Sequence, residues 1–173
     1  MTQKYNVAVA GATGAVGTEI VQILEERNFP IDKLFLLASS KSKGKKVEFR
    51  DQEIVVEDLS EFDFSKAHIG LFSPGGKISA EFAPKAAKAG CIVIDNTSHF
   101  RMQQNIPLVV PEVNANALDD FFDDENRTNI ISNPNCSTIQ MVVALKPLHE
   151  KAIINRVVVS TYQAVSGAGK TGM

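Results

Sequence analysis

The sequence predicts an α/β protein built on a doubly wound, mostly parallel sheet with helices on both faces. Short apolar, often β-branched runs alternate along the chain with segments whose apolar residues recur at helical spacing. Several of these runs are almost continuously apolar, as expected for parallel strands covered on both faces. No repeat or low-complexity segment interrupts the alternation.

The first half of the chain contains strand and helix patterns in regular order. In sequence, we expect a strand at 5–10, a helix at 18–28, a strand at 31–39, one or two antiparallel or edge strands at 45–60, a strand at 66–76 and a helix at 77–90. Gly90 is the expected stop of that last helix, because glycine readily adopts the left-handed conformation that ends many helices.

The second half repeats the alternation after one interruption. In sequence, we expect a strand at 91–100 that begins with Cys91, an irregular surface excursion at 106–128, a short strand in 129–135, a helix from Cys136 to 152, and a strand from Ile154 into a glycine-rich end. The excursion is predicted from two prolines and an acidic cluster that break the apolar pattern.

Composition excludes several classes of protein. With 173 residues and a net charge of −2, the chain lacks the basic surplus typical of nucleic-acid or anionic-membrane binding. We find no signal peptide and no run of membrane-spanning length. Two cysteines without CxxC spacing make no disulfide framework, so a cytoplasmic protein is expected, and no metal site.

A glycine-rich turn, "GATGAVG", follows the first strand and contains Gly11, Gly14 and Gly17. Backbone amides at a helix N-terminus, with no Cβ in the way, form a site for a pyrophosphate. The spacing is one residue longer than the GxGxxG fingerprint, and a tight turn that merely needs glycine is the alternative. Three glycines in this context favour a Rossmann-like nucleotide-binding domain.

The second strand ends in "ASSKSKGKK", which contains hydroxyls and lysines but no carboxylate. An acidic residue at this place usually binds the ribose hydroxyls of NAD, whereas basic or hydroxyl groups accept the 2′-phosphate of NADP. A solvated basic hairpin is the alternative. Together with the glycine turn, the segment favours NADP.

Cys136 stands in "SNPNCSTIQ", at the predicted junction of a strand and a helix. The positive end of a helix dipole and nearby amides favour a thiolate, which suits covalent catalysis on a carbonyl. An inert core cysteine is the alternative, and Cys91 is expected to be one. The polar neighbours of Cys136 favour a nucleophile.

The motifs "GATGAVG", "SSKSKGK", "SPGG", "DNTSHFRM", "SNPNCSTIQ" and "TYQAVSGAG" occur in the order found in aspartate-semialdehyde dehydrogenases, which the whole chain resembles. The resemblance implies NADP-dependent reductive dephosphorylation of L-aspartyl 4-phosphate through a cysteine thioester, on the route to diaminopimelate, lysine, threonine and methionine. It makes Cys136 the nucleophile and Gln163 a residue that orients the acyl group. It also makes Arg101 a phosphate-binding residue and Asn135 an active-site amide.

The resemblance also implies the cofactor contacts. The cofactor-binding residues expected on this basis are Gly11, Thr13, Gly14, Ala15, Val16, Gly17, Ser39, Ser40, Lys41, Ser42, Ser73, Gly75, Gly76, Asn96, Ser166 and Gly167. Lys41 stands where many relatives have arginine, so a bidentate phosphate contact becomes a point charge.

Two domains are implied: an NADP-binding domain at 1–153 that carries Cys136, and the start of a catalytic and dimerisation domain at 154–173. The family's acid/base histidine would lie beyond Met173, as would the arginine that grips the substrate carboxylate. His68, His99 and His149 are therefore not assigned, and the chain alone is expected to be inactive. The expected partners are an acyl phosphate, an aldehyde and inorganic phosphate, with homodimerisation of the full-length protein.

Three other functions remain as alternatives. N-acetyl-glutamyl-phosphate reductase also forms a cysteine thioester and uses NADPH, but its cysteine motif differs from "NPNCST". Glyceraldehyde-3-phosphate dehydrogenase generally uses NAD with an acidic residue after the second strand. A non-catalytic dinucleotide-binding paralogue or sensor is disfavoured because Cys136, Arg101 and Gln163 occur together.

Overall fold

A seven-stranded sheet forms the centre of the molecule, in a computed structural model that describes residues 3–123 and 127–162. The strands are β1 (Tyr5–Ala10), β2 (Ile31–Ala38), β3 (Lys46–Phe49), β4 (Gln52–Asp58), β5 (Ile69–Phe72), β6 (Ile92–Asp95) and β7 (Ile130–Ser132). Their order is β3-β4-β2-β1-β5-β6-β7, and every pair is parallel except β3 with β4. The predicted doubly wound, mostly parallel sheet is confirmed.

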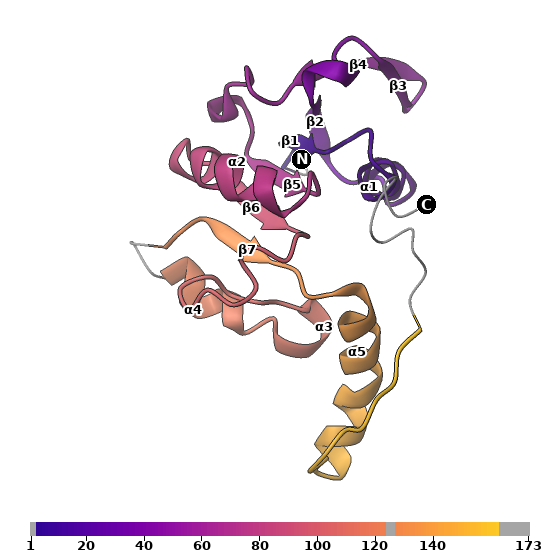
Figure 1. Cartoon of the computed structure of the whole chain (residues 1–173), viewed down its shortest axis with the longest axis vertical. Helices are drawn as coiled ribbons and strands as arrows, with labels where there is room; N and C mark the ends of the chain where they lie inside the picture. Colours follow the sequence, from indigo (N-terminus) through magenta and orange to yellow (C-terminus); the bar gives the residue numbers. More distant parts are fainter. Residues whose placement is uncertain (1–2, 124–126, 163–173) are drawn as a thin grey trace.

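Helices follow most of the strands (Figure 1). The α-helices are α1 (Ala15–Glu26), α2 (Gly76–Lys88), α3 (Pro111–Asn114), α4 (Ala117–Asp123) and α5 (Cys136–Lys151). Two short 3₁₀ turns are η1 (Ser40–Ser42) and η2 (Phe64–Lys66). The predicted stop of α2 is confirmed, because Gly90 lies two residues beyond the helix at φ +91°.

The core lies on both faces of the sheet because successive side chains of a strand point to opposite sides. Val7 and Val9 of β1 pack with Val21 and Leu24 of α1 on one face. Ala8 and Ala10 belong to the cluster on the other face, where α2 contributes Ala83, Ala86 and Ala87. These contacts hold α1 and α2, which follow β1 and β5, against the two faces of the sheet.

The segment at 106–128 is more ordered than the sequence predicts. It contains α3 and α4, and Val109 and Phe121 pack against Ile131 of β7 in a third buried cluster. Leu108 also bridges to Ser132 at the end of β7. The prediction of an irregular surface excursion is wrong here, because apolar residues of the segment, among them Val109 and Phe121, pack against β7.

The strand expected from Ile154 is absent between 153 and 162, where the described chain has neither helix nor strand. Most apolar side chains here are exposed, with Val158 at 87% and Tyr162 fully so. A strand needs a neighbouring strand to satisfy its backbone groups, and among the described residues none lies beside this segment. Residues 163–173 lie outside the described residues.

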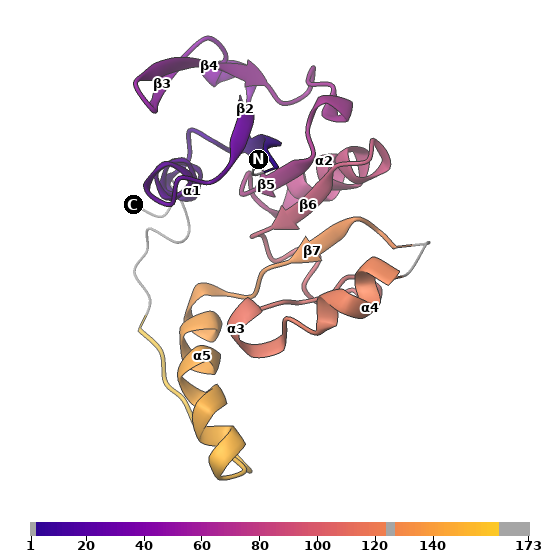
Figure 2. The ribbon, with the colours of Figure 1, turned by 180° about the vertical axis from the view of Figure 1, so that it is seen from behind.

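Helix α5 extends away from the sheet beside α3 (Figures 1 and 2). The prediction of a helix starting at Cys136 is confirmed, although none of its residues is buried. Within residues 3–123 and 127–162, no helix has the length and apolar character needed to cross a membrane.

Candidate functional site

The parallel strands bring most of the predicted site residues to one edge of the sheet. The glycine turn follows β1, Ser39 and Ser40 follow β2, Ser73 follows β5 and Asn96 follows β6, while Asn135 and Cys136 come after β7. In open α/β sheets, ligands bind outside the carboxyl ends of the strands. The fold therefore gathers these loops where a ligand is expected.

The glycine turn is packed so tightly that side chains would not fit. Gly11 has φ +84°, and a Cβ there would lie 2.8 Å from the backbone carbonyl of Ser73. A Cβ on Gly17 would lie 2.1 Å from the carbonyl oxygen of Gly11. Helix α1 begins within this segment, at Ala15, with Gly14 as N-cap and no side-chain cap. First-turn amides have no partner within their helix, so this turn fits a pyrophosphate.

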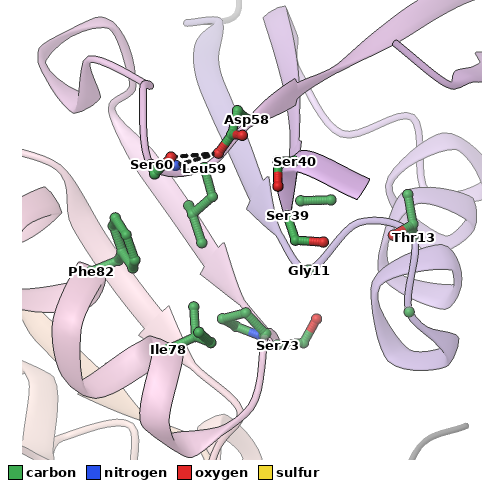
Figure 3. A pocket seen from close by; sticks show the side chains of 13 residues that line it. Gly11, Thr13, Ser39, Ser40, Asp58, Leu59, Ser60, Ser73, Ile78 and Phe82 are labelled. Carbon is green, nitrogen blue, oxygen red and sulfur yellow. Dashed lines mark hydrogen bonds between the residues drawn. The ribbon is translucent and has the colours of Figure 1, made fainter. Parts of the chain in front are cut away.

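The glycine turn borders a cavity of about 470 Å³ (Figure 3). The residues around it are Gly11, Thr13, Gly14, Ala38, Ser39, Ser40, Asp58, Leu59, Ser60, Ser73, Pro74, Ile78 and Phe82. We name it the nucleotide pocket. The predicted residues among them lie in the loops after β1, β2 and β5. The residues that were missed are Ala38, Asp58, Leu59, Ser60, Pro74, Ile78 and Phe82. The sequence contains a signal for Asp58, because this residue ends a strand of alternating polar and apolar residues at the edge of the sheet where ligands are expected.

The serine-lysine segment folds as the 3₁₀ turn η1 beside the glycine turn. Thr13 Oγ1 donates a hydrogen bond to Ser42 Oγ at 3.4 Å. Lys43 pairs with Glu61 at 2.5 Å, and this hydrogen-bonded carboxylate raises the lysine pKa. Among the described residues, Lys41 forms no ion pair.

A second cavity, of about 300 Å³, adjoins the nucleotide pocket and shares Ser73 with it. It is lined by Val16, Ser73, Gly75, Gly76, Asn96, Thr97, Ser98, Arg101 and Asn135. We name it the anion pocket. Seven of the nine residues were predicted from the sequence, and only Thr97 and Ser98 were missed, both inside the quoted motif "DNTSHFRM".

Two backbone carbonyls hold Arg101 in place. Its Nε donates to the Asn133 carbonyl oxygen at 2.8 Å, and Nη2 donates to the Asn96 carbonyl oxygen at 2.9 Å. The Asn133 side-chain amide donates to Asn96 Oδ1 at 2.6 Å, which ties together the loops after β6 and β7. A guanidinium has five N–H donors, so Arg101 is fixed while keeping donors for an anion in the pocket.

Asn135 caps helix α5 and places Cys136 at its first position. Asn135 Oδ1 accepts hydrogen bonds from the backbone N–H and hydroxyl of Ser137, at 3.0 and 2.6 Å. The Cys136 thiol donates to the same oxygen at 3.9 Å, and the residue is exposed. Cys136 therefore lies directly after a residue that lines the anion pocket, at a helix N-terminus.

The other cysteine is core, as predicted. Cys91 is completely buried, and burial raises the pKa of its thiol to about 12. The structure places it immediately before β6, not within the strand. A buried thiol with this pKa is not a nucleophile at ordinary pH.

Several predicted residues lie outside both cavities. Ala15 and Gly17 are in the first turn of α1, and Lys41 and Ser42 are in η1. Gln163, Ser166 and Gly167 lie outside the described residues, and their roles stay predictions.

The three histidines also line neither cavity. His68 Nδ1 accepts from the Asn6 backbone N–H at 3.0 Å, and His149 Nδ1 accepts from that of Ile154 at 3.2 Å. The ring of His99 packs edge-on against Phe100.

Comparison with known proteins identifies the family. Residues 6–121 match the family described as semialdehyde dehydrogenase, NAD binding domain. Residues 145–173 match the one described as semialdehyde dehydrogenase, dimerisation domain. The chain belongs to the semialdehyde dehydrogenase family and contains its NAD-binding domain.

Homologues of high identity along the whole chain are aspartate-semialdehyde dehydrogenases. Aspartate-semialdehyde dehydrogenase 2 of Vibrio cholerae is 58% identical over 173 residues, which are 100% of this chain and 50% of that protein. The crystal structure of the Vibrio cholerae enzyme II complexed with ASA superposes with a TM-score of 0.93 at 56% identity, covering 99% of this chain and 50% of that one.

A more distant structure is the Candida albicans aspartate-semialdehyde dehydrogenase with NADP. It has a TM-score of 0.70 at 27% identity, covering 88% of this chain and 48% of that one. The chain thus spans about half the length of the curated relatives it matches.

Proposed function

We propose that this chain supplies the NADP site and the nucleophile of an aspartate-semialdehyde dehydrogenase, which reductively dephosphorylates L-aspartyl 4-phosphate to L-aspartate 4-semialdehyde. The observation that carries the proposal is the anion pocket. It is lined by Val16 of α1, by Arg101 and by Asn135, which directly precedes Cys136 in the sequence. Dinucleotide, acyl phosphate and thiol would therefore meet at one edge of the sheet.

The first chemical step uses residues of this chain alone. The Cys136 thiolate attacks the acyl carbon, the bond from that carbon to the phosphate oxygen breaks, and phosphate leaves with the bonding pair. A thioester remains on Cys136. Arg101 balances the phosphate charge, because its guanidinium is already oriented by the carbonyls of Asn96 and Asn133.

The cofactor contacts follow from the nucleotide pocket. Amides of the glycine turn hold the pyrophosphate, while the hydroxyls of Ser39 and Ser40 and the charge of Lys41 bind the 2′-phosphate of NADP. When bound, NADPH supplies the hydride that reduces the thioester to the aldehyde level. NADP is preferred to NAD because no carboxylate directly follows β2 and Lys41 is not neutralised by an ion pair among the described residues.

Acylation of the thiol tests this function. The chain is mixed with L-aspartyl 4-phosphate, digested and analysed by mass spectrometry. We expect one aspartyl group on the Cys136 peptide, removable by hydroxylamine and reduced in yield by competing inorganic phosphate. Cys136→Ser should not form the hydroxylamine-labile thioester, while Cys91→Ala should be acylated normally. Acylation elsewhere, or none at Cys136, would contradict the proposal.

A further inference from the structure

The end of β4 brings a carboxylate into a pocket where the sequence predicted none. Asp58 is 8% exposed and borders the nucleotide pocket with Leu59 and Ser60. Both hydrogen bonds that it receives go to Oδ1, from the Ser60 backbone N–H at 2.9 Å and the Ser60 hydroxyl at 2.7 Å. These two bonds, drawn as dashed lines in Figure 3, fix the carboxylate. Among the described residues, no donor forms a hydrogen bond with Oδ2.

The strand order shows which part of a dinucleotide Asp58 would meet. This step rests on the proposed function. The glycine turn follows β1, and the groups expected to bind the ribose phosphate follow the adjacent strand, β2. Asp58 ends β4, on the far side of β2 from β1. The part of the ligand beyond the ribose is the base, so Asp58 lies at the base end of the pocket.

The neighbours of Asp58 suit a flat base. Leu59 faces Ile78 and Phe82 of α2 across the pocket (Figure 3), and Pro74 completes the apolar lining. Ile78 is 40% exposed, so part of its apolar side chain is open to a ligand in the pocket. An apolar slot with a single fixed carboxylate at its rim matches a base that has an amino group on its edge.

We propose that Asp58 selects adenine, with Oδ2 accepting a hydrogen bond from the exocyclic 6-amino group of the base. A carboxylate accepts hydrogen bonds and donates none when ionised. It therefore favours adenine over hypoxanthine, which carries a carbonyl oxygen at the same position. Asp58 is in this account a specificity-determining residue of the cofactor site and has no part in the chemical steps.

Nicotinamide hypoxanthine dinucleotide phosphate is the matched probe, since it differs from NADP only in having a carbonyl oxygen in place of the 6-amino group, with the accompanying proton on N1. Titration calorimetry on the chain should give an affinity for NADP about tenfold higher than for the hypoxanthine analogue, a difference of ~1.4 kcal/mol. In Asp58→Asn the ratio should fall to within about twofold, because an amide both donates and accepts.

Asp63→Asn is the control variant. Asp63 forms the same turn, with Oδ1 accepting from the backbone N–H and hydroxyl of Ser65, but it does not border the pocket. Its ratio should equal that of the unaltered chain. Equal affinity of the unaltered chain for the two dinucleotides would overturn the inference without any variant. An Asp58→Asn variant that changes only the NADP-to-NAD ratio would place the carboxylate at the ribose and also overturn it.

Failure of the proposed function looks different. In that case the chain would bind none of the three dinucleotides, NADP, its hypoxanthine analogue and NAD. The proposed role of Asp58 would then be wrong together with the proposed nucleotide site. Binding of both NADP forms without discrimination leaves the nucleotide site standing and removes only the adenine contact.

Discussion

At the scale of single residues, the two cysteines have opposite environments. Burial raises the pKa of Cys91 to about 12, whereas Cys136 is exposed at the start of α5. Because only the thiolate is alkylated, iodoacetamide at mildly alkaline pH should label Cys136 faster than Cys91 by at least about 100-fold. Peptide mapping after brief alkylation measures both rates. In denaturing urea the rates should converge, and similar rates in the native protein would disprove the difference.

Two aspartates allow a matched titration experiment. The pKa of Asp58 is lowered from 3.8, first by the Ser60 hydroxyl and then by the Ser60 backbone N–H, and Ser65 lowers that of Asp63 in the same way. Ser60→Ala should raise the pKa of Asp58 and leave that of Asp63 unchanged, and Ser65→Ala should do the reverse. NMR titration of the side-chain carboxyl carbons measures the pKa of both aspartates.

The sign of the linked stability follows from the direction of these shifts. Since the folded pKa lies below the unfolded value, each aspartate stabilises the fold above about pH 3.8, and this contribution is lost as pH falls through the folded pKa. Removing either serine hydroxyl should therefore weaken stability near neutral pH more than in strong acid. An Asp58 pKa that does not move in Ser60→Ala would show that the hydroxyl contact is absent in solution.

At the scale of elements, the junction of β1 and α1 depends on Gly17. An alanine Cβ there would lie 2.1 Å from the Gly11 carbonyl oxygen, and backbone cannot easily shift away. Gly17→Ala should lower the free energy of unfolding by about 1–3 kcal/mol or more. Urea denaturation followed by circular dichroism measures the loss.

Gly76→Ala is the matched control at the start of α2. Its Cβ would meet only the His99 Cβ, at an ordinary 3.9 Å, so stability should change by less than about 1 kcal/mol. Equal losses in the two variants would mean that helix propensity and not the close approach governs Gly17.

Some of the helices and strands could be predicted from sequence patterns, and others could not. Strand and helix patterns predicted the order of most elements along the chain and the start of α5, since both follow from local apolar spacing. The packing of Phe121 against Ile131 could not be predicted in this way, because it is a tertiary contact between α4 and β7 that local apolar spacing does not encode. The strand predicted from Ile154 failed for the converse reason. Its β-branched residues have the propensity, but no neighbouring strand lies beside them in the part of the chain described.

At the scale of the whole molecule, the candidate site is a product of topology. The sequence motifs predicted that Arg101 and Asn135 serve the same function. In the structure both line one cavity at the carboxyl edge of the sheet, together with Gly75, Gly76 and Asn96. Asp58 was missed because the sequence pattern predicts only one or two antiparallel or edge strands at 45–60. In the structure β4 also pairs with β2 and lies inside the sheet, so its end reaches the nucleotide pocket.

The central claim is that the glycine turn and η1 together form a site for NADP, and comparative binding tests it most directly. Titration calorimetry with NADP and NAD should give an affinity for NADP about tenfold higher, a preference that shrinks as salt rises because it depends partly on charge. Lys41→Ala should reduce the preference. Lys46 is already paired with Glu53 at 2.6 Å, so the control variant Lys46→Ala should retain the preference for NADP. Equal affinities for NADP and NAD at low salt would contradict the account.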